Sequence, residues 1–185
     1  MVFLFYSTFS SPFDTFTIIW KETGSKLLIQ RIFLSDPEQK SEVKALESFK
    51  QIKLGSFSQI NSLGEKIQRF LKGEKVKFDL ELLDFDNCFE IQKRVLLVEY
   101  EIPRGWVSTY KRIADKIGLP KGARVVGNAL ARNPFPIVIP CHRAIKSNGE
   151  LGGFQGGLKM KRALLEMEEV EFSDKGKVIT DIMFY

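Results

Sequence analysis

The sequence predicts an α+β fold in two domains: a small N-terminal domain with a β-sheet and helices, residues 1–84, and a mostly helical C-terminal domain, residues 85–185. Two observations carry this prediction. Aromatic and β-branched residues form three strand-like stretches near the start of the chain, and apolar residues then recur mainly at helical spacing. The 185 residues suffice for two small domains. Because no repeat or long linker separates them, we expect the domains to pack directly on each other.

Composition excludes several classes of protein. Hydrophobic residues make up 44% and charged residues 28% of the chain, which excludes a disordered protein. No run approaches the roughly 18 apolar residues of a membrane-spanning helix. The start of the chain is apolar, but the first basic residue is Lys21, so the positive region of a signal peptide is missing. The two cysteines form no disulfide framework, so we expect a reducing compartment, the cytoplasm, or the nucleus in a eukaryote.

Strand signals dominate the first domain. We expect strands over residues 3–9, 13–21 and 26–34, because these stretches are rich in aromatic and β-branched residues. The turn residues Thr23-Gly24-Ser25 join the last two strands. Alternating apolar residues over 76–82 predict one further strand at the end of the domain.

Helix signals lie between these strands. Asp36 and Pro37 offer an N-cap and a first helical residue. An apolar helical period then runs up to Gly73, a residue type that commonly follows a helix end. The period consists of Ile60, Leu63, Ile67, Phe70 and Leu71.

The second domain contains a helix-turn-helix pattern. A first helix begins near Phe89 and ends at Pro103-Arg104-Gly105. Ser108 can cap the next helix, which Gly118-Leu119-Pro120 breaks, and Ala123 begins another that runs to Asn133. Two short helices joined by such a turn are typical of DNA-binding proteins. Many two-helix corners in other proteins look the same, so this pattern alone is weak.

Charge strengthens the DNA-binding interpretation. The net charge is +5, and residues 103–162 contain twelve Lys and Arg against two acids, Asp115 and Glu150. Such a one-sided field attracts a polyanion, most commonly a nucleic acid. The alternative is a solvated basic face without a ligand.

The pair Cys141-His142 is the strongest chemical signal. His142 is the only histidine, and it directly follows one of two cysteines. A thiol becomes a good nucleophile only when a base or positive charge favours its ionisation, so we expect reactivity below the ordinary thiol pKa. In an extended chain the two side chains would point to opposite faces. A water would then carry the proton between them, and an acid elsewhere would fix the imidazole tautomer. The alternative is a buried structural cysteine beside a surface histidine.

We expect no metal site. One histidine and two cysteines 53 residues apart do not supply a tetrahedral zinc site. Cys88 falls on the apolar face of its predicted helix, so we interpret it as a core residue.

Several short motifs follow one another in the second domain. They are Ile102-Pro103-Arg104-Gly105, Ser108-Thr109-Tyr110, Ala123-Arg124-Val125-Val126-Gly127, Arg132-Asn133-Pro134, Ile139-Pro140-Cys141-His142-Arg143, Leu151-Gly152-Gly153-Phe154 and Gly156-Gly157-Leu158. In order, spacing and residue types, over about 80 residues, these motifs resemble those of the O6-alkylguanine-DNA alkyltransferases, also called methylated-DNA–protein-cysteine methyltransferases. The first domain resembles only the variable N-terminal domain of that family.

The resemblance implies an irreversible, single-turnover methyltransferase. Cys141 would take the alkyl group from O6 of guanine, and also from O4 of thymine, without a cofactor. His142 would act as the base through a water, and Glu168 would orient it. Asn133 resembles the hinge between the recognition helix and the active-site segment.

The resemblance also implies residues for binding DNA. The partner would be double-stranded DNA carrying O6-alkylguanine, bound by a monomer. Tyr110 would crowd the phosphate of the target nucleotide, and Arg124 would replace the extruded base in the stack. Ala123, Gly127 and Arg132 would complete the DNA-binding surface, although small residues on a helix can equally serve tight packing. The residues implied for the substrate pocket are Pro136, Phe154 and Gln155.

Two positions and one four-residue segment depart from the family pattern. Phe154 stands where the family usually has Tyr, so a phenol donor is missing while stacking remains possible. Gln155 replaces a frequent Ser or Arg, which leaves its backbone N–H as the expected donor. The usual Thr-x-Phe-Gln is replaced by Asn87-Cys88-Phe89-Glu90. The zinc site of some relatives needs more histidines than the single one of this chain, so we expect it to be absent.

Two other functions compete with alkyl transfer. A Cys–His hydrolase would need an oxyanion hole and a hydrolysable acyl intermediate, and no cysteine-hydrolase signature is present. A helix-turn-helix regulator without catalytic activity would not need Cys141.

Overall fold

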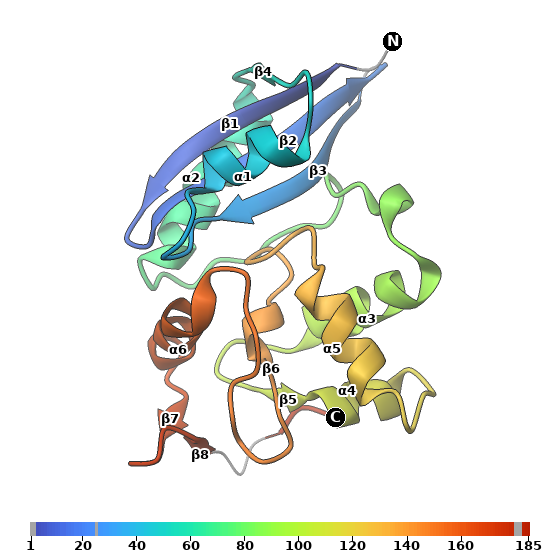
Figure 1. Cartoon of the computed structure of the whole chain (residues 1–185), viewed down its shortest axis with the longest axis vertical. Helices are drawn as coiled ribbons and strands as arrows, with labels where there is room; N and C mark the ends of the chain where they lie inside the picture. The colour runs from blue at the N-terminus through green and yellow to red at the C-terminus, as the bar shows by residue number, and fades with distance from the viewer. Residues whose placement is uncertain (1–2, 25, 180–182) are drawn as a thin grey trace. The chain divides into compact units, whose positions relative to one another are not determined.

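The computed structural model describes residues 3–24, 26–179 and 183–185. The chain divides into two compact units (Figure 1). One unit contains the chain up to Phe85 together with residues 134–138, and the other contains residues 86–133 and 139–185. A small sheet and a set of helices make up these units, which confirms the predicted α+β class. No described helix is long and apolar enough to cross a membrane.

The first unit is built on a four-stranded sheet of order β3-β2-β1-β4, in which β4 alone runs parallel to its neighbour. The three strands expected near the start of the chain and the turn at Gly24, whose φ is 61°, are confirmed. The elements are β1 (Leu4–Ser11), β2 (Asp14–Thr23), β3 (Lys26–Leu34), α1 (Ser41–Ser48), β4 (Lys53–Leu54) and α2 (Ser58–Leu71).

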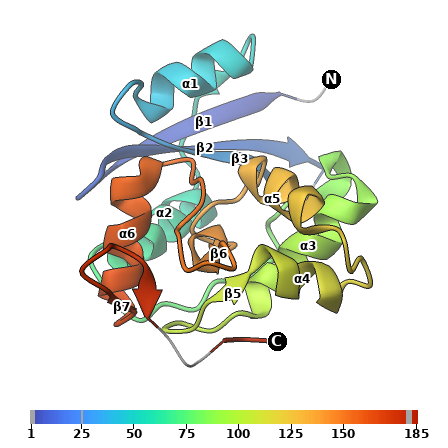
Figure 2. The ribbon, with the colours of Figure 1, turned by 60° about the horizontal axis from the view of Figure 1, so that its bottom comes forward.

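Helices α1 and α2 lie on opposite faces of this sheet (Figure 2). Strand β2 is therefore buried on both sides over five consecutive residues, which end at Trp20. On the α1 face, Ile19 and Phe33 pack with Ala45. The helical period ending at Leu71 faces the other side, and burial of both faces accounts for the continuous apolar run of β2.

Two predictions for this unit are wrong. Asp36 does not begin a helix: its carboxylate accepts hydrogen bonds from the backbone N–H of Glu38 and Gln39, which closes a turn, and α1 begins only at Ser41. Residues 76–82 do not form a strand. Burial alternates there, but the described pairing is limited to one bridge between Ile29 and Leu83. The alternating apolar residues therefore predicted a strand, but residues 76–82 do not pair with a neighbouring strand along their length.

Residues 134–138 join the first unit, although the expected boundary places them in the second domain. The carbonyl of Pro134 accepts a hydrogen bond from the Ile32 N–H at 2.7 Å. Phe135 is fully buried and packs edge-on against Phe85, with ring centroids 5.3 Å apart. Pro136 lies in this segment and is buried as well.

The second unit is mostly helical, with two small sheets. Strands β5 and β6 pair in parallel, and β7 and β8 pair antiparallel. The elements are η1 (Phe85–Asn87) at the junction, α3 (Glu90–Glu101), β5 (Ser108–Thr109), α4 (Tyr110–Lys116), α5 (Ala123–Ala131), η2 (Cys141–Arg143), β6 (Ala144–Ile145), α6 (Gly157–Met167), β7 (Glu171–Phe172) and β8 (Val178–Ile179).

Helices α4 and α5 form the predicted helix-turn-helix, with a shift in the cap. Thr109, rather than Ser108, caps α4 by accepting a hydrogen bond from the Arg112 N–H at 3.1 Å. The Ser108 hydroxyl instead donates to the Phe184 carbonyl at 2.8 Å. Gly118 follows α4 with a φ of 74°, where a residue with a side chain would be strained.

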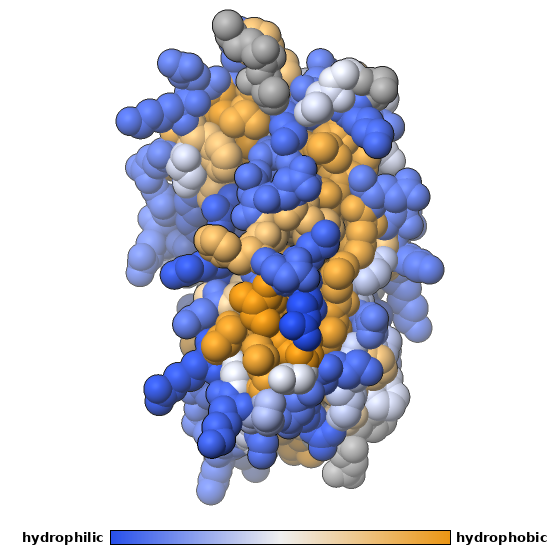
Figure 3. Space-filling view, turned by 90° about the vertical axis from the view of Figure 1, so that its right-hand side faces the viewer, coloured by the Kyte–Doolittle hydropathy of each residue, from blue (hydrophilic) through white to orange (hydrophobic). Residues whose placement is uncertain are grey.

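The sequence predicted that Cys88 is a core residue of its helix, and this prediction is wrong. It lies in a half-buried bend after η1, because α3 begins only at Glu90. Three large apolar side chains of the second unit are exposed: Phe89 before α3, Leu97 on α3 and Val125 on α5. Figure 3 shows apolar side chains among polar ones on the face that turns toward the viewer.

Candidate active site

Cys141 begins the short 3-10 helix η2 and is buried, with 6% of its surface exposed. The Arg143 N–H closes the turn by donating to the Pro140 carbonyl at 2.8 Å. The Cys-His pair thus lies on a helical turn and not on the extended chain that the sequence analysis assumed. Successive side chains of such a turn are rotated by about 120°, which still directs the thiol and the imidazole along different lines.

His142 and Glu168 form a buried pair. Nε2 of His142 lies 3.0 Å from Oε1 of Glu168, and both residues are almost completely buried. Glu168 is the C-cap residue of α6, so the turn that carries the cysteine and the end of α6 meet here. With Nε2 engaged, Nδ1 is the ring nitrogen that can exchange a proton with the thiol through a water.

Arg143 completes this network, and the sequence analysis missed it. Its Nε and Nη2 donate to the two oxygens of Glu168 at 2.9 and 2.7 Å, and its Nη1 donates to the Ile102 carbonyl at 2.6 Å. The sequence placed Arg143 among the basic residues and at the end of the Cys-His motif, but gave it no role in the site. Its position directly after the Cys-His pair was the signal that could have assigned it to the site.

The electrostatic environment shifts the pKa values of Glu168, His142 and Cys141. Burial would raise the pKa of Glu168, but the ion pairs and hydrogen bonds with His142 and Arg143 outweigh burial and lower it to about 2. Burial lowers the pKa of His142, against the attraction of Glu168. Burial raises the pKa of Cys141 to about 11, against the lowering effects of Asn133 and Lys161, and the expected reactivity below the ordinary thiol pKa stays a prediction. The thiol and imidazole are therefore both neutral near pH 7.

Asn133 connects the end of α5 to the active-site segment. It is buried, and its side-chain amide donates to the Ile139 carbonyl at 3.1 Å. A hydrogen bond from Asn133 also lowers the pKa of Cys141, against the larger effect of burial. The residue implied as a hinge thus contacts both the backbone before the cysteine and the thiol itself.

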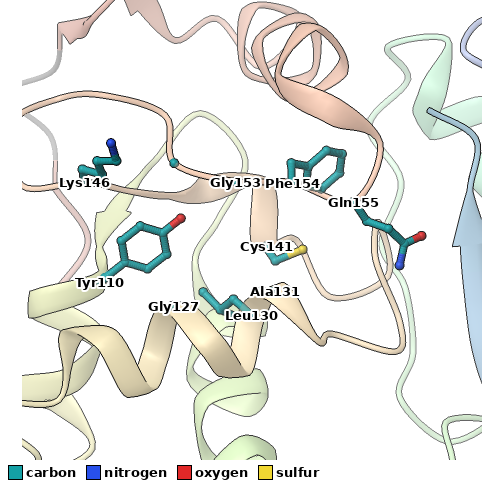
Figure 4. Close-up of a pocket in the computed structure, with 10 residues that line it drawn as sticks. Tyr110, Gly127, Leu130, Ala131, Cys141, Lys146, Gly153, Phe154 and Gln155 are labelled. Carbon is teal, nitrogen blue, oxygen red and sulfur yellow. The ribbon is translucent and has the colours of Figure 1, made fainter. Parts of the chain in front are cut away.

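A pocket of about 360 Å³ opens beside Cys141, a size typical of small-molecule sites. The cysteine lies between the loop that carries Gly153 and Phe154 and the helix that carries Leu130 and Ala131 (Figure 4). The lining residues are Tyr110, Gly127, Leu130, Ala131, Cys141, Lys146, Gly152, Gly153, Phe154 and Gln155.

Two of the three expected pocket residues line this pocket. The Phe154 ring lies edge-on to His142, with ring centroids 6.2 Å apart. The Gln155 side chain extends away from Cys141 (Figure 4), which leaves its backbone as the part nearer the site. Pro136 is not among the lining residues, because the segment 134–138 belongs to the first unit.

Tyr110 forms another wall of the pocket. Burial raises its pKa to about 12, with smaller effects from Glu99 and Cys141, so the phenol stays protonated. A Cβ atom added to Gly152 would collide with the Tyr110 hydroxyl, so only glycine allows the loop to pass this close.

The face of α5 offers basic and small residues. Arg124 and Arg132 are exposed, and Ala123 is half-buried. A Cβ atom added to Gly127 would meet no described atom within 4 Å. Helix packing therefore does not explain this glycine, which lines the pocket instead.

Lys161 was also missed by the sequence analysis. It is fully buried, and its ammonium donates to the carbonyls of Ala144 and Gly153 at 2.7 and 3.3 Å. Burial lowers its pKa to about 8, while Cys141 and Glu99 oppose this shift. Like Arg143, this residue of the basic segment has an internal role.

Comparison with known proteins relates this site to a family. The profile of the 6-O-methylguanine DNA methyltransferase DNA-binding domain matches residues 90–170. A methylated-DNA–protein-cysteine methyltransferase of Methanosarcina acetivorans is 33% identical over 165 residues, which cover 89% of this chain and 98% of that protein. The chain belongs to the methylated-DNA–protein-cysteine methyltransferase family. This result confirms the resemblance on which the sequence analysis relied.

Other family members match to different extents. The methyltransferase of Methanothermobacter thermautotrophicus is 52% identical over 111 residues, which cover 60% of this chain but only 62% of that protein. A crystal structure of the Mycobacterium tuberculosis O6-methylguanine methyltransferase superposes with a TM-score of 0.71 at 32% identity, covering 90% and 93% of the two chains. A crystal structure of the Mycobacterium tuberculosis OGT in complex with DNA superposes with a TM-score of 0.70 at 33% identity, and the match covers 89% of this chain and 92% of that chain.

Proposed function

We propose that this chain repairs DNA by transferring an alkyl group from O6 of guanine, and from O4 of thymine, to its own Cys141. One observation carries the proposal: Cys141 lines the pocket, and the adjacent His142 forms a hydrogen bond with the buried Glu168. Family membership supports the same reaction. The chain would act once per molecule and would need no cofactor.

The reaction begins with ionisation of the thiol. Nδ1 of His142 accepts the Cys141 proton through a water, and Glu168 stabilises the resulting imidazolium through Nε2. Arg143 holds the Glu168 carboxylate in position through two hydrogen bonds. Because burial raises the pKa of Cys141 to about 11, the thiol is protonated near pH 7, and the thiolate forms through this proton transfer.

Alkyl transfer is then a displacement at carbon. Sγ forms a bond to the alkyl carbon as the bond from that carbon to O6 breaks, and the bonding electrons remain with guanine. The guanine anion takes up the proton that left the thiol. The thioether is stable, which makes the transfer irreversible.

DNA would bind along α5. A base inside the duplex cannot reach Cys141, so the alkylated nucleotide must be extruded into the pocket. Arg124 is exposed on α5 and would fill the gap in the stack, and Tyr110 would contact the target nucleotide. Ala123 and Gly127 would let the DNA backbone approach closely, and Arg132 would contact a phosphate.

The proposed pocket and compartment follow from the same chemistry. Phe154 would stack on the base, and the Gln155 backbone would donate to its edge. Cys141 must remain a free thiol, which favours a reducing compartment such as the cytoplasm, or the nucleus of a eukaryote. One chain carries every residue named here, so a monomer suffices.

Intact-mass measurement tests this proposal. The protein is incubated with duplex DNA carrying O6-methylguanine, and we expect a gain of one methyl group, which peptide mapping places on Cys141. Cys141→Ser should bind the duplex and gain no mass, because a hydroxyl is far less acidic than a thiol. Cys88→Ser, the matched control, should gain the methyl group as the wild type does.

Other outcomes identify the competing functions. Binding of the alkylated duplex without any gain of mass in the wild type would favour a regulator. Repeated turnover of an ester substrate with unchanged protein mass would favour a hydrolase.

A further inference from the structure

A second hollow, of about 610 Å³, adjoins the pocket at Cys141. The pocket and the hollow share four lining residues, which are Lys146, Gly152, Gly153 and Phe154. No described residue of α5 lines the second hollow. It therefore lies beyond the Gly153 loop as seen from α5, and the proposed mechanism does not use it.

Basic groups surround this hollow. Lys146, Lys175 and Lys177 line it, against one acid, Glu150. The Lys146 ammonium donates to the Glu150 carboxylate at 2.7 Å. Within the described part of the chain, no acid forms an ion pair with Lys175 or Lys177. The N-terminus of α6, which no side chain caps, lines the hollow too and adds a partial positive charge. The hollow is thus suited to anions.

The β7–β8 hairpin fixes Lys175 and Lys177 beside the active-site segment. The Val178 N–H donates to the Gly149 carbonyl at 2.9 Å. Val178 also packs against the buried cluster that contains Ile145 of β6, the strand directly after η2. The two lysines are therefore anchored to the segment that carries the proposed nucleophile.

The hollow lies where a DNA strand would leave the pocket. An extruded nucleotide stays joined to its neighbours through phosphates, so its strand must pass the mouth of the pocket. Lys146 lines the pocket at the same end as Tyr110, the residue proposed to contact the target nucleotide (Figure 4). Along each strand a further phosphate follows about every 3.4 Å of helix axis. Lys146 and Lys175 are exposed and Lys177 is half-buried, so the three ammonium groups can reach such phosphates.

We propose that Lys146, Lys175 and Lys177 form a lysine track that binds the phosphates of duplex DNA next to the extruded nucleotide, across the pocket from α5. This inference rests on the proposed function, because that function places the duplex at this pocket. The hairpin lysines lie outside the basic segment 103–162, so the charge of that segment did not indicate them. With α5, the track would hold the DNA on both sides of the pocket.

The salt dependence of DNA binding tests the proposal. Binding of an unmodified duplex to the wild type and to the double variant Lys175→Gln/Lys177→Gln is followed by fluorescence anisotropy at several salt concentrations. Each phosphate contact contributes about 0.9 to the slope of the logarithm of the binding constant against the logarithm of the salt concentration. We expect the double variant to lower the magnitude of this slope by about two, and to bind at least about fivefold more weakly at about 0.1 M salt.

The double variant Lys75→Gln/Lys77→Gln is the matched control. These two lysines have the same spacing, are exposed in the first unit and do not line the hollow. Their replacement removes the same charge, and its slope should equal that of the wild type. An unchanged slope in the hairpin variant, or an equal decrease in both double variants, would overturn the proposal.

Glu150→Gln should have the opposite effect on binding. The substitution removes the acid that lines the hollow and releases Lys146 from its ion pair. We therefore expect the duplex to bind a few times more tightly than to the wild type. Unchanged or weaker binding would contradict the contact between Lys146 and a phosphate.

A footprint on the wild type covers the case in which a variant does not fold. Acetic anhydride acetylates accessible lysines, and peptide mass spectrometry gives the rate at each one. Saturating duplex should slow the acetylation of Lys175 and Lys177 severalfold and leave Lys75 and Lys77 unaffected. Equal rates at the hairpin lysines with and without duplex would overturn the lysine track.

Binding of an unmodified duplex needs no alkyl transfer, so two possible failures can be told apart. If no methyl group reaches Cys141 while the hairpin variant still lowers the slope, the proposed reaction fails and the lysine track stands. If the methyl group is transferred and the slope stays the same, only the lysine track fails.

Discussion

Glu168 and Glu99 are two buried carboxyl groups of the second unit whose pKa values shift in opposite directions. Glu168 accepts hydrogen bonds from His142 and Arg143, which keep it ionised. Glu99 has no hydrogen-bond partner among the described residues and stays protonated at neutral pH. Burial disfavours both charges, so the partners decide the outcome.

Replacing Glu168 by Gln should destabilise the protein at neutral pH. The substitution keeps the shape of the side chain but leaves the Arg143 guanidinium buried without its counter-ion, which costs about 3 kcal/mol. The pKa of Glu168 is about 2 when folded and about 4.3 when unfolded. Its contribution is therefore present above about pH 4.3 and is lost as the pH falls toward about 2. Urea unfolding at pH 7 and pH 3 should show a smaller difference between Gln variant and wild type at pH 3.

Glu166→Gln is the matched control for this prediction. Glu166 pairs with Arg162 on the surface of the same helix, and both side chains are about half exposed. Exposed pairs of this kind contribute at most about 0.5 kcal/mol. A loss of stability as large as that of Glu168→Gln would show that the burial of the ion pair is not the cause.

Glu99→Gln should have the opposite effect on stability. The folded pKa of Glu99 is about 8, above its unfolded value of about 4.3, so the folded state holds the proton more tightly. This contribution is complete below about pH 4.3 and is lost as the pH rises toward about 8. As the pH rises from about 5 to about 8, we expect the free energy of unfolding of the Gln variant to increase by a few kcal/mol relative to that of the wild type. A constant difference across this range in urea unfolding would contradict the assigned shift.

At the scale of residues, the sequence indicated the proposed nucleophile but not its electrostatic environment. Cys141 and His142 could be singled out because the only histidine follows a cysteine. Arg143 could have been assigned to the site only by its position directly after this pair, and Lys161 and Glu99 offered no such signal. Each is a charged residue of ordinary type, and its role depends on burial and on partners that lie far away in the sequence.

At the scale of elements, helix α5 carries the proposed DNA contacts. Arg124→Ala should slow repair of duplex DNA at least about tenfold but change the reaction with free O6-benzylguanine little. Extruding a base costs a few kcal/mol, part of which the intercalated guanidinium restores, and each 1.4 kcal/mol lost reduces the rate about tenfold. The free base has no stack to refill. Rates of both reactions, measured with intact protein, check the prediction.

Arg132→Ala distinguishes a stacking role from simple charge. Arg132 is exposed at the end of α5. If it contacts a phosphate, its replacement should weaken the binding of all duplexes equally. The slope of the logarithm of the binding constant against the logarithm of the salt concentration should then decrease in magnitude by about one. If Arg124→Ala behaves in the same way, or if it slows both substrates equally, Arg124 does not replace the extruded base.

Elements were predictable where local sequence and tertiary structure agree. The strands up to Leu34 and the helix-turn-helix were predicted because their periodicity, turns and breaking residues are local signals. Residues 76–82 misled the prediction because a strand also needs a neighbour with which to form hydrogen bonds, and that neighbour is not a local property. Asp36 misled it because an aspartate side chain can close a turn as readily as it can cap a helix.

At the scale of the whole molecule, residues 134–138 belong to the first compact unit, whereas the expected boundary places them in the second domain. Only five residues separate Asn133 from Ile139, yet they pack with the strands of the first unit. Ile137 takes a φ of 74°, which is rare for a β-branched residue and persists only where the surroundings impose it. No local pattern reveals an insertion of this kind, because the partners of the segment lie about 100 residues earlier in the chain.

This insertion predicts that the second domain is unstable when produced alone. A fragment of residues 86–185 contains Phe135, Ile137 and Val138, which are at most 2% exposed in the full chain, but lacks the strands that cover them. We expect the fragment to bind a hydrophobic dye and to aggregate, and Phe135→Ser should reduce both effects. In the full chain the same substitution should instead cost about 3 kcal/mol of stability or more, because Phe135 fills a closed core. If Phe135→Ser destabilised fragment and full chain alike, the segment would belong to the second domain, and the boundary near residue 85 would divide the chain cleanly.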